Sequence, residues 1–254
     1  MNKDEIIQSK IEDCVTKCLN GMYVTTTKFL DAHEQAIART IVRNSSGCKT
    51  LFYGGYTDAE RRMLVCIPRE LDFDEEKACE GLVKVLHIET AKGSRKLGHR
   101  DYLGSVLSLG LDRSVIGDIL VRSDGADMII LPEMEDFLLN EYSRAAHTEL
   151  KTSICNIGQL AIPEKRTQTI RDTVPSERLD NIVSSAFKIS RAQASKAINA
   201  GLVSVNHIEN TKIDSKVVEG DILVLRGKGK VFVSEVGGES KKGRIWIGIE
   251  RYID

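Results

Sequence analysis

The feature that most constrains this fold is a pair of short helices, each with its own boundary signals, followed directly by a strand, in residues 177–206. In the first helix, apolar residues recur at i, i+3, i+4 and i+7, namely at Leu179, Ile182, Val183 and Ala186. This spacing predicts one helix face that packs against a core. The unit carries nothing that is obviously catalytic, so its exposed side chains hold the information about function.

The second helix has a marked beginning and end. Ser190 is expected as its N-cap, Gln193 completes a capping box three residues later, and Gly201 supplies the left-handed residue that ends it. The residues that can pack against the first helix are Ala194, Ala197 and Ile198. The residues left for solvent or a partner are Arg191, Ser195, Lys196 and Asn199.

After these helices, "LVSVNH" alternates into a strand and a turn, and "KVVEGDILVLRGKGKVFV" supplies two further strands. The sequence therefore predicts two helices packed on a small sheet, with exposed cations on the second helix and on the turn "RGKGK". Between Arg178 and Lys230 there are nine Lys or Arg against five Asp or Glu, a local charge of +4 in a chain whose net charge is −1. Such a surface suits a phosphate backbone.

The rest of the chain predicts an α+β protein with further modules. Residues 1–75 show amphipathic helices, followed by a strand, a Gly-Gly turn, a short helix from Thr57 and a second strand. We interpret this segment as an N-terminal α/β module. Residues 76–160 alternate helices and strands as in a compact α/β sandwich, and they contain the basic stretch "KGSRKLGHR". Prolines and charges in residues 161–175 predict a hinge before a third domain at 176–254.

The segment "RLDNIVSSAFKISRAQASKAINAGLVSVN", followed by "VVEGDILVLRG", resembles the S4 RNA-binding domain. Four further motifs, spread over nearly the whole chain, resemble the YlmH family of bacterial S4 proteins: "FLDAHEQAIA", "YGGYTDAERRML", "HRDYLGSVLSLGLDRSVIGDILV" and "GGESKKGRIWIGIERYI". One departure is His207 after Asn206, where many S4 domains have Gly. The resemblance implies an N-terminal module, a central RRM-like domain and a C-terminal S4 domain.

The family resemblance also implies a function. It indicates a non-enzymatic protein that binds rRNA and tRNA on the large ribosomal subunit carrying peptidyl-tRNA, in ribosome-associated quality control of stalled nascent chains. The expected contacts in the S4 domain are Arg178, Ser190, Arg191, Gln193, Lys196, Asn199, Arg226, Lys228 and Lys230. A second set in the central domain comprises Lys92, Arg95, Lys96 and Arg100, for which a merely solvated face is an equally good interpretation.

An RNA-modifying enzyme, or its accessory RNA-binding subunit, is the alternative hypothesis. "RLD" at Arg178 to Asp180 also occurs around the catalytic aspartate of pseudouridine synthases, but the residues that extend that pattern are absent. We therefore expect Asp180 to be a surface residue of the first helix. "GESKKGR" imitates a phosphate-binding loop but is followed by an alternating strand where a helix is required. The sequence predicts no catalytic residue and no cofactor.

The six cysteines are scattered, with no C-x-x-C pair and no His placed to complete a zinc site, so we expect reduced thiols and no metal. Cys14 and Cys18 are expected to be buried as small hydrophobic residues. No apolar run approaches the ~18 residues needed to cross a bilayer, so the sequence predicts no membrane partner and a cytoplasmic location. We also expect a monomer.

Overall fold

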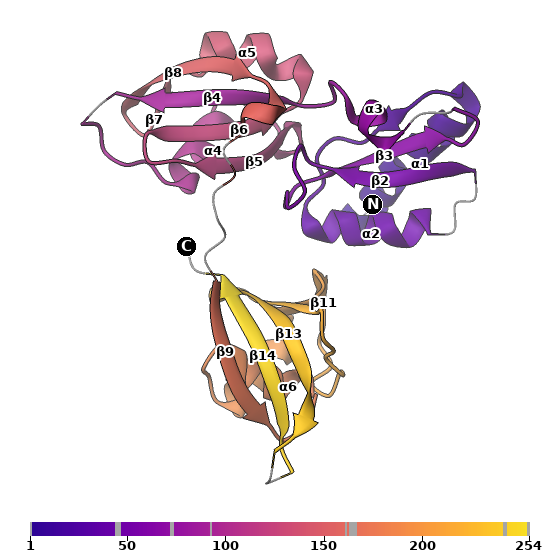
Figure 1. Ribbon diagram of the computed structural model, residues 1–254, viewed down its shortest axis with the longest axis vertical. Helices are drawn as coiled ribbons and strands as arrows, with labels where there is room; N and C mark the ends of the chain where they lie inside the picture. The colour runs from indigo at the N-terminus through magenta and orange to yellow at the C-terminus, as the bar shows by residue number, and fades with distance from the viewer. Residues whose placement is uncertain are drawn as a thin grey trace. The chain divides into compact units, whose positions relative to one another are not determined.

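The structure is a computed structural model, and it describes residues 2–43, 47–71, 74–91, 93–160, 162, 167–240 and 243–252. Helices and strands are both abundant, which confirms the predicted α+β class. Contacts divide the chain into two compact units, residues 1–163 and 164–254, where the sequence predicted three domains and a hinge (Figure 1). Each unit is described separately below.

The first unit begins with a small three-stranded antiparallel sheet in the order β1-β3-β2. Its elements are α1 (Lys3–Gly21), β1 (Thr25–Thr26), α2 (Ala32–Val42), β2 (Cys48–Tyr53), β3 (Met63–Pro68) and α3 (Glu75–Cys79). Ile11, Cys14 and Cys18 of α1 are buried against β3, which confirms the expected burial of both cysteines. The prediction of a short helix from Thr57 is wrong, because residues 54–61 form turns and bends.

The same unit continues into a five-stranded antiparallel sheet in the order β5-β6-β4-β8-β7. Its elements are β4 (Lys84–Thr90), α4 (His99–Leu107), η1 (Arg113–Val115), β5 (Ile116–Val121), β6 (Gly125–Ile130), η2 (Pro132–Met134), α5 (Glu135–Glu141), β7 (Arg144–Ala145), β8 (Thr148–Cys155) and η3 (Ile157–Gln159). The order β-α-β-β-α-β, with the first strand central, is the split βαβ topology of RRM-like domains. Tyr102 and Leu138 pack from α4 and α5 onto Leu86 and Met128 of the sheet.

The two sheets of the first unit share one hydrophobic core. Phe29 packs so closely on β5 that a Cβ added at Gly117 would lie 3.0 Å from its ring. The buried carboxylate of Asp118 accepts hydrogen bonds from the Tyr56 hydroxyl at 2.8 Å and from the backbone N–H groups of residues 60 and 61. These bonds hold residues 54–61 as turns, which explains why the helix predicted there does not form.

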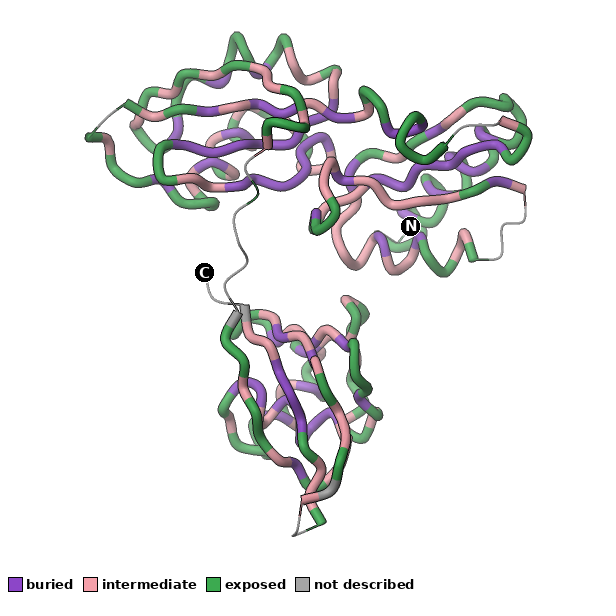
Figure 2. The backbone as a smooth tube through the Cα atoms, in the orientation of Figure 1, coloured by how far each residue is buried: buried purple, intermediate pink, exposed green. Residues whose placement is uncertain are grey.

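The second unit contains β9 (Thr167–Val174), α6 (Leu179–Ala186), α7 (Arg191–Asn199), β10 (Val203–Val205), β11 (Ile208–Glu209), β12 (Ile222–Leu225), β13 (Gly229–Glu239) and β14 (Ile245–Tyr252). The strands form one antiparallel sheet in the order β11-β10-β12-β13-β14-β9. Leu179 and Ile198 of the two helices pack in one core with Ile247 and Ile249, and the middle of β14 is accordingly buried (Figure 2).

The predicted hinge at 161–175 needs correction. Residues 167–174 are the edge strand β9, which pairs along its whole length with β14. Ile170 and Val174 pack in the core, while the polar residues between them suggested a linker. Pairing with a strand so far along the chain leaves no local signal in the sequence. Residues 161 and 163–166 of the predicted hinge lie outside the described residues.

Candidate nucleic-acid interface

The helix α7 begins and ends where the sequence predicts. The Ser190 hydroxyl accepts a hydrogen bond from the Gln193 N–H at 3.2 Å, and the Gln193 side chain accepts one from the Ser190 N–H at 2.9 Å. Gly201 has a φ of +67° and ends the helix. Since Ser190 and Gln193 use their side chains in the cap, the exposed Lys196 and Asn199 are the better placed of the predicted residues to meet a ligand.

Asp180 is not the surface residue that the sequence predicts. It is 1% exposed, and its carboxylate accepts hydrogen bonds from Arg178 at 3.1 and 3.3 Å and from Arg191 at 2.9 Å. Burial by itself would raise the pKa of Asp180, but the hydrogen bonds and charges of the two arginines outweigh it and lower that pKa. Arg178 and Arg191 therefore position α6 against α7, in addition to any contact with a ligand.

The turn between β12 and β13 carries the other predicted cations. The N–H of Arg226 donates to the carbonyl of Leu202 at 2.9 Å, which places this turn beside the end of α7. Gly227 and Gly229 have φ values of +82° and +102°, so the tight loop depends on glycine at these positions. Arg226 and Lys228 are exposed, whereas Lys230 is half-buried.

The turn at Asn206 and His207 forms despite the missing glycine. Both residues have positive φ, 50° and 69°, and they join β10 to β11 as a two-residue hairpin loop. The Asn206 side chain donates to the buried Asp221 at 2.8 Å and accepts from the N–H of Ile222, which holds this turn against the sheet. The departure from Gly therefore leaves the fold around α7 intact.

The basic stretch of the central domain leads into α4, and Arg100 lies in the first turn of that helix. Arg95 donates to Asp101 at 2.7 Å, and the second oxygen of Asp101 caps the helix through the N–H of Gly98. Lys96 and Arg100 are exposed, and Lys92 lies outside the described residues. Of this predicted set, Arg95 is thus held by a carboxylate, while Lys96 and Arg100 extend into solvent.

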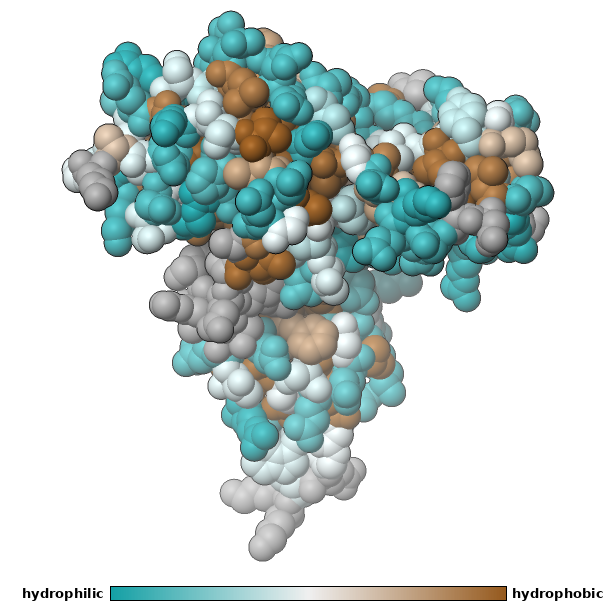
Figure 3. Space-filling model, turned by 45° about the horizontal axis from the view of Figure 1, so that its top comes forward, coloured by the Kyte–Doolittle hydropathy of each residue, from teal (hydrophilic) through white to brown (hydrophobic). Residues whose placement is uncertain are grey.

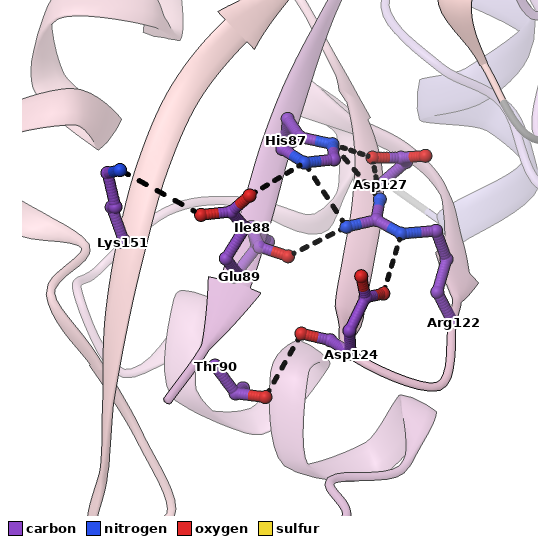
Figure 4. Close-up of polar contacts among 8 residues, drawn as sticks. All are labelled: His87, Ile88, Glu89, Thr90, Arg122, Asp124, Asp127 and Lys151. Atoms are coloured by element: carbon purple, nitrogen blue, oxygen red, sulfur yellow. Dashed lines mark hydrogen bonds and ion pairs between the residues drawn. The ribbon is translucent and has the colours of Figure 1, made fainter. Parts of the chain in front are cut away.

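The sheet face opposite α4 and α5 carries a polar cluster that the sequence analysis missed (Figure 4). His87 Nδ1 lies 2.8 Å from the buried Asp127, Arg122 donates to the same carboxylate, and Arg122 Nε donates to Asp124 at 3.2 Å. Lys151 lies 4.0 Å from Glu89. His87 and Asp127 are cross-strand partners, so only the register between β4 and β6 brings them together.

This sheet face lacks the features by which RRM domains usually bind RNA. RRM domains stack bases on aromatic residues of their sheet, but none of the five strands here contains Phe, Tyr or Trp. The cations Arg122 and Lys151 are paired with carboxylates, which offsets their attraction for phosphate. In the view of Figure 3, the first unit is mostly hydrophilic, and apolar residues reach its surface in small separate patches. The exposed side chains of Lys96 and Arg100 are therefore better placed to meet a phosphate than the paired cations of the sheet face.

Comparison with known proteins agrees with these features. A family described as "Putative RNA-binding domain in YlmH" matches residues 79–159, and the S4 domain family matches residues 177–223. The "Ribosome-associated protein quality control protein P2" of Bacillus subtilis is 29% identical over 225 residues, which cover 89% of this chain and 86% of that protein. These matches support a YlmH-family S4 RNA-binding protein, the family that the sequence motifs indicate.

A solved structure supports the fold of this chain. The "Cell division protein ylmH from Streptococcus pneumoniae" superposes with a TM-score of 0.52 at 16% identity, covering 64% of this chain and 96% of that one. At this identity the likeness concerns the fold alone. The S4 match ends within β12, so β13, β14 and β9 extend the sheet beyond the matched residues.

The described residues contain no group of three or more His, Cys, Asp or Glu side chains arranged to hold a metal ion. The six cysteines are free thiols, and all but Cys155 are buried. Within the same described ranges, no helix combines the length and the apolar character needed to cross a membrane.

Proposed function

We propose that this protein is a non-enzymatic RNA-binding factor that acts as a monomer on the ribosome in the cytoplasm. Its target is the large subunit that carries peptidyl-tRNA, where it contacts rRNA and tRNA during quality control of stalled nascent chains. The matches to the RNA-binding domain of YlmH and to the S4 domain, and the name of the Bacillus subtilis relative, support this assignment.

The observation that carries the proposal is a group of three exposed cations along α7 and the neighbouring turn. Lys196, Arg226 and Lys228 form no ion pair with any carboxylate among the described residues. Arg178 and Arg191, by contrast, are bound to Asp180. A phosphate that approaches the three exposed cations displaces no internal partner, so the full attraction is available for binding.

The geometry of Asp180 argues against the alternative, a pseudouridine synthase-like enzyme. A catalytic aspartate must reach its substrate, whereas this carboxylate is buried and accepts hydrogen bonds from two arginines and from the N–H of Asn181. Incubation of the purified protein with rRNA and tRNA, followed by analysis of the nucleosides, tests this point. Modified nucleosides formed by the protein would overturn the non-enzymatic assignment.

The main experiment is sedimentation of the full chain with large subunits that carry peptidyl-tRNA. Lys196→Ala and Arg226→Ala should each weaken binding severalfold, and the double variant should lose most of it. Lys17→Ala is the matched control, because Lys17 is an exposed lysine on α1, far from α7 in sequence and in a different unit. Equal binding by the double variant and the control would contradict the proposed surface.

The proposed contribution of the central basic stretch needs separate fragments. If both units contact RNA, their connection makes the second contact intramolecular and raises avidity by ~10²-fold or more. Fragments 1–163 and 164–254 respect the contacts of each unit, whereas a cut at 172 would remove most of β9. If fragment 164–254 sediments with large subunits as tightly as the full chain does, the stretch containing Lys96 and Arg100 is only a solvated face.

A further inference from the structure

The outer face of the C-terminal sheet carries the single tryptophan of the chain in an exposed position. Along β14, Ile247 and Ile249 point into the core beneath α6 and α7, so Trp246 points to the opposite face of the sheet. In Figure 1, β9, β14 and β13 lie in front of α6, and the viewer sees this outer face. Trp246 is 47% exposed, although β14 is an interior strand of the sheet and Trp246 pairs with residues on both neighbouring strands.

Small residues surround the indole of Trp246. Its partner on β13 is Gly237, and a Cβ added at Gly238 would lie 3.9 Å from the indole Cδ1. Gly248 is the next residue of β14 on the same face. A Cβ added at Gly237 would have no heavy atom within 4 Å, so the ring is uncovered on the side of β13, whereas Ser234 and Glu235 fill the space above Gly248.

A fixed arginine lies beside the same indole. Arg244 Nε donates to the Thr173 hydroxyl at 3.0 Å, and Arg244 Nη2 donates to the Thr173 carbonyl. Thr173 is the cross-strand partner of Trp246 on β9, so the guanidinium is held next to the ring. Among the described residues, Arg244 Nη1 has no hydrogen-bond partner and is available to a ligand.

The charges on this face differ between its two sides. Arg171 is the partner of Gly248 on β9 and is exposed, so two arginines lie on the β9 side of Trp246. Glu235, the partner of Gly248 on β13, places a carboxylate on the other side. An anion is therefore attracted to the β9 side and repelled from the β13 side.

We propose that this outer face is a second RNA site, which binds an unpaired nucleotide of single-stranded RNA. The base stacks on Trp246, and the phosphate lies on the β9 side, where it meets Arg244 and Arg171. Stacking on an exposed aromatic residue together with a neighbouring arginine is how proteins hold single strands without reading their sequence. The site rests on the proposed RNA-binding function, but it lies outside the S4 match and opposite the α7 surface.

Tryptophan fluorescence of the full chain tests this site directly, because the chain contains one tryptophan. Titration with a single-stranded adenine 12-mer should quench the emission of Trp246 to saturation, whereas an RNA duplex of equal length should leave it nearly unchanged. Trp246→Ala should weaken binding of the 12-mer by roughly 5- to 150-fold, and Trp246→Phe by much less, since Phe still stacks. Tyr23→Ala, which removes an exposed aromatic residue of the first unit, is the control.

The outcomes separate this site from the proposed function. Quenching by the single strand, lost affinity in Trp246→Ala and unchanged affinity in Tyr23→Ala support the site. If the 12-mer and large subunits bind without quenching, and Trp246→Ala binds like the wild type, the stacking site is wrong while the α7 surface stands. If neither any RNA nor the large subunit binds the wild-type protein, the proposed function itself fails. Arg171→Gln should reduce affinity for the 12-mer severalfold and leave the fluorescence of the free protein unchanged.

Discussion

Replacing Asp180 with alanine should destabilise the C-terminal unit strongly, although the residue lies in the first turn of a helix. The carboxylate accepts hydrogen bonds from Arg178, from Arg191 and from the N–H of Asn181. The arginine side chains are 38% and 56% exposed, so they recover hydration when the carboxylate is lost. We therefore count about 1 kcal/mol for each arginine and about 1 kcal/mol for the N–H, or about 3 kcal/mol in all.

Urea unfolding of the full chain, followed by tryptophan emission, measures this loss. The only tryptophan lies in the second unit, so its signal reports the unfolding of that unit alone. With an m-value of about 1–3 kcal/mol/M for a domain of this size, a loss of about 3 kcal/mol lowers the midpoint by roughly 1–3 M. Asp180→Asn should fall between the wild type and Asp180→Ala, because an amide keeps the shape and an acceptor but loses the charge.

Asp214→Ala is the matched control for Asp180→Ala. Asp214 is an exposed aspartate of the same unit, and its loss should change the free energy of unfolding by less than about 0.5 kcal/mol. If the midpoints of Asp180→Ala and Asp214→Ala agree within error, the buried carboxylate does not hold α6 against α7. The account of Arg178 and Arg191 as positioning residues would then be refuted.

Three further predictions follow from single contacts. Folding lowers the pKa of Asp180, so its carboxylate stabilises the second unit above about pH 4, and this stabilisation is lost as the pH falls through the folded pKa. In an acid titration followed by tryptophan emission, the stability of Asp180→Asn should therefore fall less with pH than that of the wild type. Asp118→Ala should cost the first unit about 3 kcal/mol, measured by hydrogen exchange, since three donors lose their acceptor. Lys188→Gly should stabilise the second unit by about 0.5–1 kcal/mol in urea, because Lys188 ends α6 with a φ of +51°.

The two helices of the S4 region could be predicted from the sequence because their signals are local. Ser190, Gln193 and Gly201 act within α7 and its ends, and the apolar spacing of α6 lies within three turns. The strand β9 could not be predicted, because its partner β14 is distant along the chain and its polar residues resemble a linker. Local pattern thus determines helices here better than it determines edge strands.

The candidate site shows the same division between local and distant information. A sequence identifies which residues are cationic, but it does not show which of them are paired. Asp180 follows Arg178 closely, yet its burial and its bond to Arg191 depend on how α6 crosses α7. His87 and Asp127 meet only through strand register. The exposed face of Trp246 likewise depends on which side of the sheet α6 and α7 cover, and neither helix signals this in its own residues.

The pairing of cations determines how strongly salt should weaken RNA binding by the second unit. Each phosphate neutralised on a double helix contributes about −0.9, the value for B-DNA, to the slope of log affinity against log salt. If only Lys196, Arg226 and Lys228 contact phosphates, the slope for fragment 164–254 is about −3. If Arg178, Arg191 and Lys230 also contact phosphates, the slope is about −5.

We expect the slope of about −3, because Arg178 and Arg191 would have to break their hydrogen bonds to the buried carboxylate of Asp180. Breaking such a bond costs more free energy than one exposed phosphate contact provides. Asp180→Asn should then steepen the slope towards −5, and a slope near −5 in the wild type would refute this account of the surface.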